Sequence, residues 1–214
     1  MICICAASNK EWDCIKQCLA PKTVEVHPYG ECFQSQTRDA VLYSKIGTRK
    51  SGASAGIQYL IDRYSPEKII LIGTCAGVDT KHSLCDVIIP HLAIQGDCFD
   101  DGTAGKISEK YSYEVNPGIH DGTVIAAYDL PLIYQEDCKH MEKMGIIARD
   151  MESGAVANVC HINGIDLYII KGITDFPGNY DPKDERQYLE YQTNVPIVMN
   201  KILTEILPEI IQKV

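Results

Sequence analysis

Short apolar runs alternate with amphipathic segments along the chain, and this alternation predicts strands and helices in turn. Residues 1–7 form an apolar strand, and residues 9–20 form a helix in which Trp12, Ile15 and Leu19 share one face. The other expected elements are strands at 40–47, 67–77, 86–95, 122–129 and 165–175, and helices at 50–65 and 150–163. From residue 181 onwards the pattern predicts a long helical region that Pro196 kinks or breaks.

Strands that alternate with helices are typical of an α/β protein. We expect one domain over residues 1–214, with three layers (αβα) around a central mixed, largely parallel twisted sheet. Residues 96–122 show little periodicity and many turn formers, so we expect a long loop there, of the kind that is usually functional.

The net charge of −9 argues against a nucleic acid or an anionic membrane as partner, because both require a basic face. The N-terminus has no cationic region, and its apolar run is too short for a secretion signal or a spanning helix. These features predict a cytoplasmic protein.

The chain contains ten cysteines but no Cys-x-x-Cys pair, so neither a disulfide framework nor a metal site is expected. Cys3 and Cys5 have strand spacing, and Cys14 and Cys18 have helical spacing, which suits small core residues.

Polar residues follow several of the predicted strands, at the edge where α/β proteins bind ligands. These positions are Glu11, the glycine turn 73–77, the segment 151–153, and Asp175. Each has an ordinary structural interpretation: Glu11 and Glu152 suit the first turn of a helix, and Asp175 suits an N-cap. Phe176 and Pro177 weaken the N-cap interpretation, because any following helix must begin later.

The runs "IGTCAGV", "RDMESGAVANVC" and "IIKGITD", in this order and at these separations, resemble the nucleoside phosphorylase and nucleosidase superfamily. The chain is most similar to the 5′-methylthioadenosine/S-adenosylhomocysteine nucleosidases, over nearly its whole length. The resemblance implies hydrolysis of the N-ribosidic bond of a purine nucleoside, with release of adenine and with no metal or organic cofactor. It also implies a homo-oligomer, with a dimer favoured.

Carried over residue by residue, the resemblance makes Asp175 the acid that protonates purine N7, beside Thr174 and with Lys171 as a supporting cation. Glu152 then holds the ribose hydroxyls and Met151 packs under the sugar. The resemblance makes Glu11 the base that activates water. The remaining residues that it assigns to the substrate site are Thr74, Cys75, Ala76 and Asp129.

These residue types suit the reaction. An acid on the base side helps the purine to leave, and a buried site raises the pKa that such an acid needs. An ionised Glu152 favours the positive charge that grows on the sugar. Glu11 can take a proton from water but would repel a phosphate dianion.

Phosphorylases need cations at the nucleophile, typically an arginine two residues before the glycine turn, where this chain has Leu71. Hydrolysis is therefore the leading hypothesis. Arg49 stands where nucleosidases usually have a second glycine, and it is either a cation near the nucleophile or a solvated residue at a helix start. The alternatives are a phosphorylase and a nucleoside-binding relative without catalysis, and Leu130 or Pro131 stands near the position of a purine-stacking ring.

Overall fold

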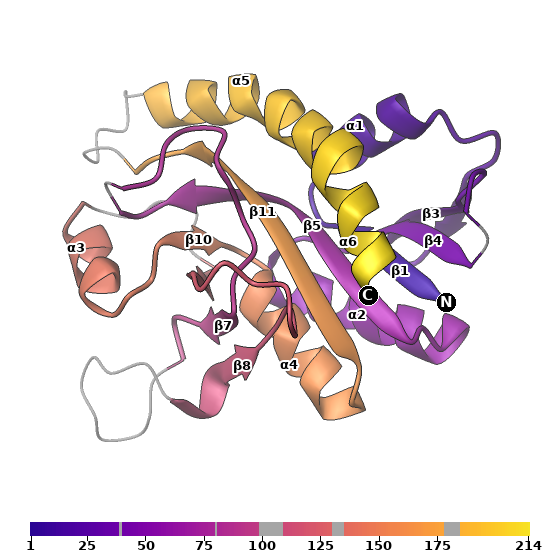
Figure 1. Ribbon diagram of the computed structural model, residues 1–214, viewed down its shortest axis with the longest axis horizontal. Coiled ribbons are helices and arrows are strands. Elements are labelled where there is room, and N and C mark those ends of the chain that lie inside the picture. Colours follow the sequence, from indigo (N-terminus) through magenta and orange to yellow (C-terminus); the bar gives the residue numbers. More distant parts are fainter. Residues whose placement is uncertain (39, 80, 99–108, 130–134, 178–184) are drawn as a thin grey trace.

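One mixed β-sheet forms the centre of the molecule, and helices cover both of its faces (Figure 1). The computed structural model describes residues 1–38, 40–79, 81–98, 109–129, 135–177 and 185–214. The strands are β1 (Ile2–Ala6), β2 (Glu25–His27), β3 (Gly30–Gln34), β4 (Val41–Lys45), β5 (Lys68–Gly77), β6 (Val87–Ile88), β7 (Leu92–Gln95), β8 (Ser112–Glu114), β9 (Val124–Ala127), β10 (Ala148–Asp150) and β11 (Asp166–Asp175). The α-helices are α1 (Asn9–Leu19), α2 (Arg49–Tyr64), α3 (Gln135–Lys143), α4 (Ser153–Asn163), α5 (Arg186–Lys201) and α6 (Leu207–Lys213), with a 3₁₀ turn at Glu109–Tyr111 and a π-helical segment at Ile202–Ile206.

The strand order is β2-β3-β4-β1-β5-β10-β9-β7-β8, and β11 pairs with β5 and β6. β1 runs parallel to β4 and β5, and β5 runs parallel to β11. β10 pairs with β5 antiparallel and with β9 parallel. The carboxyl ends of β1, β5 and β11 therefore meet at one edge, as the predicted α/β fold with a mixed sheet requires.

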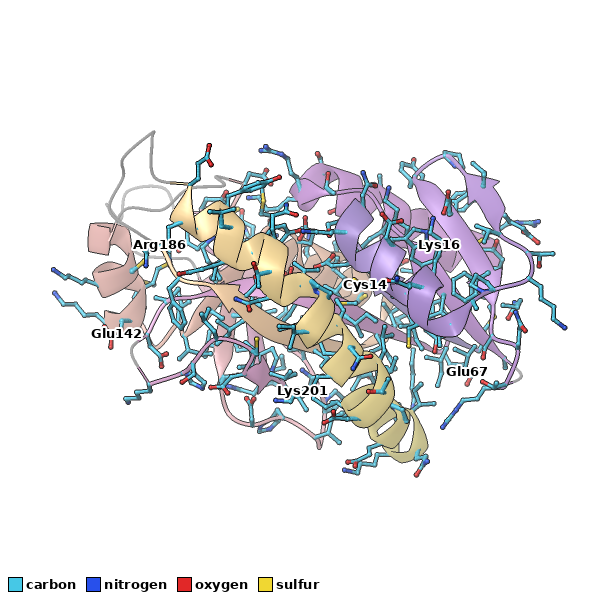
Figure 2. All side chains as sticks on the ribbon, turned by 90° about the horizontal axis from the view of Figure 1, so that it is seen from above. Cys14, Lys16, Glu67, Glu142, Arg186 and Lys201 are labelled. Carbon is cyan, nitrogen blue, oxygen red and sulfur yellow. The ribbon has the colours of Figure 1, made fainter. Side chains whose placement is uncertain are left out.

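The two faces of the sheet carry separate apolar clusters. On one face α2 and α4 pack side by side and bury Ile57, Leu60 and Val156. On the other face α1, α5 and α6 cover the sheet, with Trp12 and Val198 among the buried residues. Figure 2 shows α5 and α6 crossing the molecule with α1 beside α5. Three layers, αβα, are the result, as expected.

The boundaries of several elements differ from the sequence-based expectation. The strand expected at 86–95 is two strands, β6 and β7, because the chain bends at Pro90, whose carbonyl accepts a hydrogen bond from Asn116 Nδ2 (2.6 Å). The helix expected from residue 150 begins at Ser153, because residues 148–150 form β10. The hairpin β2–β3, the strand β8 and the helix α3 were not predicted.

Of the kink or break predicted at Pro196, the break is wrong, since α5 continues through this residue. A proline inside a helix removes one N–H donor and leaves the carbonyl four residues earlier without its usual partner. Here that carbonyl belongs to Gln192, and the Lys10 ammonium of α1 donates to it (3.0 Å). The contact between α1 and α5 thus replaces the missing hydrogen bond.

All ten cysteines are free thiols. Cys3 and Cys5 are buried in the core as expected, whereas Cys18 is exposed, because it lies on the outer side of α1. Within the described ranges, no group of His, Cys, Asp and Glu side chains has the geometry of a metal site. No helix in the same ranges has the length and apolar character needed to cross a bilayer.

Candidate active site

A cavity of about 350 Å³ opens at the edge where the carboxyl ends of β1, β5 and β11 meet. Eight of the residues predicted for the site line this cavity: Glu11, Thr74, Cys75, Ala76, Met151, Glu152, Thr174 and Asp175. Lys171 and Asp129 do not line it. The volume lies within the range of small-molecule pockets.

Glu11 is fixed at the start of α1 by a capping box. The Ser8 side chain accepts from the Glu11 N–H, and the Ser8 N–H donates to Glu11 Oε2 (2.9 Å). The other carboxylate oxygen, Oε1, accepts from the backbone N–H of Thr74 (2.7 Å) and from its hydroxyl (2.8 Å). Gly73 permits this approach, because a Cβ there would lie 2.5 Å from Oε1. The carboxylate is therefore held by donors and faces the cavity.

Glu152 occupies the N-cap position of α4, one residue before the helix, rather than its first turn. Its Oε1 accepts from the backbone N–H of Arg49 (2.8 Å), which has a positive φ of 63°. Burial and then the negative charge of Asp150 raise the pKa of Glu152 from 4.5 to about 7. The Glu152 carboxyl therefore stays protonated to a higher pH than an exposed glutamate.

The resemblance predicted Lys171 as a supporting cation of Asp175. In the structure Lys171 instead forms an ion pair with Asp150 (Nζ to Oδ2, 3.0 Å). Four residues along a strand cover roughly 13 Å, so an ammonium at 171 is too far from an acid at 175. Both members of the pair are buried, and Ser153 donates to Asp150 through its N–H (3.0 Å) and its hydroxyl. Burial lowers the pKa of Lys171, but the negative charges of Asp150, Glu11 and Glu152 outweigh burial and raise it.

Asp175 ends β11 with its carboxylate on the cavity. The Thr174 hydroxyl donates to Oδ1 (2.7 Å), and Gln187 Nε2 from α5 donates to Oδ2 (2.8 Å). Burial raises the pKa of Asp175, although these two hydrogen bonds and the charge of Arg149 act in the opposite direction. The net shift keeps the acid protonated at a higher pH than an exposed aspartate.

Asp129 supports the rim rather than the cavity. Its carboxylate accepts from the Lys50 N–H (3.0 Å), and its carbonyl accepts from Arg49 Nη1 (2.9 Å). It thereby holds the first turn of α2 in place. The Arg49 side chain is exposed and engaged with this carbonyl, although Arg49 also lines the cavity. Leu130 and Pro131, considered for purine stacking, lie outside the described residues.

Five further residues line the cavity without having been assigned to it: Ser8, Thr48, Arg149, Asp150 and Tyr191. Arg149 and Asp150 directly precede the predicted Met151, so their position in the sequence could have indicated that they also line the cavity. Tyr191 lies on α5, four residues after Gln187, and this helical spacing on one face could have indicated a second wall.

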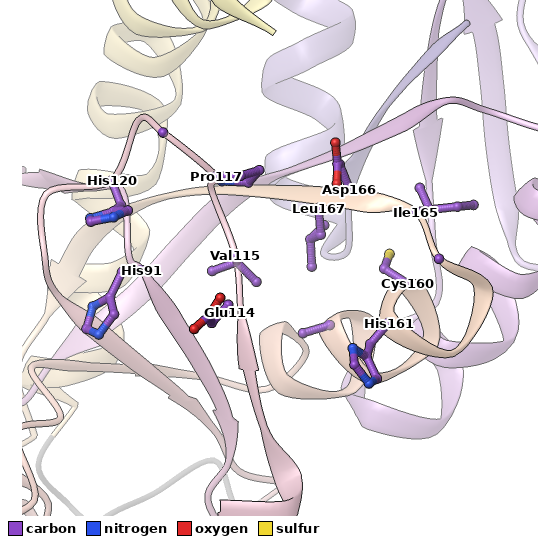
Figure 3. A pocket seen from close by; sticks show the side chains of 13 residues that line it. His91, Glu114, Val115, Pro117, His120, Cys160, His161, Ile165, Asp166 and Leu167 are labelled. Carbon is purple, nitrogen blue, oxygen red and sulfur yellow. The ribbon is translucent and has the colours of Figure 1, made fainter.

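A larger cavity of about 600 Å³ lies at the opposite edge of the sheet, around the end of α4 and the start of β11 (Figure 3). Its floor contains Val115, Leu167 and Cys160, while Glu114 and His161 at its rim are exposed. Because its carboxylates are exposed, its histidines are exposed or half-buried, and its buried floor consists of small and apolar side chains, we assign the chemistry to the smaller cavity.

In the smaller cavity, donors hold the carboxylate of Glu11, and burial raises the pKa of both Asp175 and Glu152. Three carboxyl groups in such surroundings can act as base, acid and hydroxyl ligand. The family model described as "Phosphorylase superfamily" matches residues 108–208. This match covers slightly less than half of the chain, and it shows a similarity to that superfamily in the C-terminal part.

Relatives with similar sequences are named nucleosidases. A 5′-methylthioadenosine/S-adenosylhomocysteine nucleosidase of Tolumonas auensis is 26% identical over 171 residues, which cover 70% of this chain and 74% of the relative. A protein of the same name from Buchnera aphidicola is 27% identical over 197 residues, covering 76% and 81%.

Solved structures confirm the fold. A Helicobacter pylori nucleosidase with 5′-methylthioadenosine in its active site matches with a TM-score of 0.82 at 15% identity, covering 100% of this chain and 98% of that one. A futalosine hydrolase of the same organism matches with a TM-score of 0.81 at 15% identity, covering 100% and 97%.

Proposed function

We propose that this protein hydrolyses the N-ribosidic bond of a purine nucleoside, with water as the nucleophile. The observation that carries the proposal is that Glu11, Glu152 and Asp175 line one cavity but have different surroundings. Donors hold the carboxylate of Glu11, whereas burial favours the neutral form of Asp175. The nucleosidase relatives support the same reaction.

In the proposed reaction, Glu11 takes a proton from water as the water oxygen bonds to C1′. The C1′–N9 bond breaks, its electron pair passes to the purine, and Asp175 gives its proton to N7. Glu152 accepts from the ribose hydroxyls in its ionised form, which stabilises the positive charge on the sugar. Proton exchange with solvent then returns Glu11 to its carboxylate form and Asp175 to its protonated form.

The substrates to test first are 5′-methylthioadenosine and S-adenosylhomocysteine, after the names of the relatives. The assay measures base release from a panel of nucleosides, with and without phosphate. We expect turnover without phosphate, and losses on the order of 100-fold or more in Glu11→Gln and Asp175→Asn. Circular dichroism of both variants checks that the fold is retained.

Phosphorolysis is the second candidate, because Arg49 is a cation at the cavity. Its guanidinium donates to the Asp129 carbonyl, and Leu71 stands where phosphorylases carry an arginine. Turnover only with added phosphate would replace hydrolysis by phosphorolysis. Nucleoside binding in calorimetry with no base released under any condition would instead indicate a binding protein. The predicted homodimer is tested separately by light scattering.

A further inference from the structure

Three hydroxyl side chains line one end of the cavity and have no substrate group assigned to them by the proposed reaction. Ser8 follows β1, Thr48 follows β4, and Tyr191 comes from α5, which packs against α1. The proposed acid, Asp175, lies on β11 at the other end. A hydroxyl group can both donate and accept a hydrogen bond, so this end of the cavity suits a polar part of the substrate.

The sheet fixes which part of a nucleoside reaches these hydroxyl groups. The strands run in the order β4-β1-β5-β11, so roughly 14 Å separate β4 from β11 (Figure 1). When the purine lies against Asp175 on β11, the sugar extends towards β1 and β4. Glu152 lies at this end too, because it accepts from the N–H of Arg49, which follows β4. With the 2′ and 3′ hydroxyls on Glu152 and the base on C1′, the substituent of C5′ is the group that remains.

Thr48 has a hydroxyl that the start of α2 does not use. It occupies the N-cap position, where threonine usually accepts from the first turn, but it makes no capping hydrogen bond. The N–H of Arg49 donates to Glu152 instead (2.8 Å). The N–H of Lys50 donates to Asp129 (3.0 Å). These two carboxylates cap the helix, and the exposed Thr48 side chain lies at the cavity rim.

Tyr191 is half-buried where α5 meets α1, with the Lys10 ammonium 5.6 Å from its ring centroid. Burial and the negative charge of Glu11 raise the pKa of Tyr191, although the interaction with the Ser8 side chain acts in the opposite direction. The phenol therefore stays protonated. Ser8 Oγ accepts from the Glu11 N–H (3.2 Å), and its own hydrogen can go to the Tyr191 oxygen. Tyr191 can then donate to a further acceptor without giving up Ser8.

We propose that Tyr191 and Thr48 are specificity-determining residues that bind an oxygen on C5′, so that the preferred substrate is a nucleoside with a free 5′-hydroxyl rather than a 5′-thioether. The inference rests on the proposed hydrolysis and names its substrate class. A 5′-hydroxyl accepts from one of these side chains and donates to the other. A thioether sulfur is only a weak acceptor and has no hydrogen to donate. It would displace water from both hydroxyl groups without replacing the hydrogen bonds.

The test measures kcat/KM for base release without phosphate from adenosine and inosine, each paired with its 5′-deoxy counterpart, and from 5′-methylthioadenosine. We expect the 5′-hydroxyl compound of each pair to be favoured about 10-fold, as for one or two hydrogen bonds, and adenosine to be favoured over 5′-methylthioadenosine. Tyr191→Phe should reduce the preference by slowing the 5′-hydroxyl compounds alone, and adding Thr48→Val should abolish it. Tyr188→Phe, at an exposed position of α5, is the matched control and should preserve it.

A preference for 5′-methylthioadenosine over adenosine, or equal kcat/KM within each pair, would overturn the inference while leaving hydrolysis intact. An equal loss on both members of a pair in Tyr191→Phe would also overturn it, because Tyr191 would then act through Ser8 and Glu11 rather than on C5′. If Tyr191→Phe does not fold, Thr48→Val alone decides, since this position is exposed: a reduced preference supports the inference, and an unchanged one overturns it. Release of no base from any of these compounds, with or without phosphate, would refute the proposed function itself.

Discussion

Glu152→Gln should stabilise the protein at alkaline pH while abolishing its activity. Burial and the charge of Asp150 raise the pKa of Glu152 from 4.5 to about 7, so ionising this group in the folded state is unfavourable. The difference corresponds to about 3 kcal/mol. Glutamine keeps an oxygen for the Arg49 N–H and carries no charge at any pH.

The sign of the effect follows from proton linkage. Below pH 4.5 Glu152 is neutral in both the folded and the unfolded chain. Between pH 4.5 and about 7 the folded protein binds more protons than the unfolded chain, so its free energy of unfolding falls as the pH rises. The Glu152→Gln variant lacks this fall in the free energy of unfolding, because glutamine does not ionise. Its stability relative to the unmodified protein should be near zero below pH 4.5 and reach about 3 kcal/mol above pH 7.

The assay is urea unfolding of both proteins at pH 4.5 and pH 8, followed by circular dichroism. A difference of about 3 kcal/mol at pH 8 corresponds to a rise in Tm of roughly 6 to 12 °C for a domain of this size. Glu142→Gln, at an exposed position of α3, is the control for removal of one charge. An equal difference at both pH values, or a variant less stable than the unmodified protein at pH 8, would refute the argument.

Three other substitutions test supports of the site and of the fold. Gly73→Ala should abolish base release, because its Cβ would displace the Glu11 carboxylate (2.5 Å); substrate affinity measured by calorimetry should change less. Asn116→Ala should cost about 3 kcal/mol or more in urea unfolding, because it leaves two buried carbonyls and one N–H without their partner. Lys171→Met should cost about 3 to 5 kcal/mol by the same measurement, since it strands the buried charge of Asp150, and adding Asp150→Asn should recover most of this loss.

Long elements and the residues at their ends could be predicted from the sequence. The ten-residue apolar strand β5 and the strand β11 with its terminal Asp175 are continuous hydrophobic runs, which is the pattern of strands buried on both faces. Their parallel pairing brings the glycine turn to the acid. For this reason eight predicted residues line the cavity although they are scattered from position 11 to position 175.

The remaining features depend on contacts between segments that are distant in sequence. β10 has only three residues, too few for a periodic signal, and its position beside β5 gives Arg149 its place in the cavity. The partner of Lys171 could not be predicted either, because it lies on β10 rather than on the same strand. At Pro196, Lys10 donates to the carbonyl of Gln192, a contact between two helices that a local rule for proline does not consider.

The use of α5 as a wall of the cavity has a consequence for the order in which the site is completed. This helix supplies Gln187 to the acid, Tyr191 to the lining and Asn194 to the Thr174 carbonyl (2.8 Å). Proteins are synthesised from the N-terminus, so Glu11 leaves the ribosome long before these partners. A nascent chain that ends before α5 carries Glu11, Glu152 and Asp175 with its Thr174 hydrogen bond, but it lacks the hydrogen bond that Gln187 donates to Asp175. Activity should therefore appear only late in synthesis, when the last layer of helices packs onto the sheet.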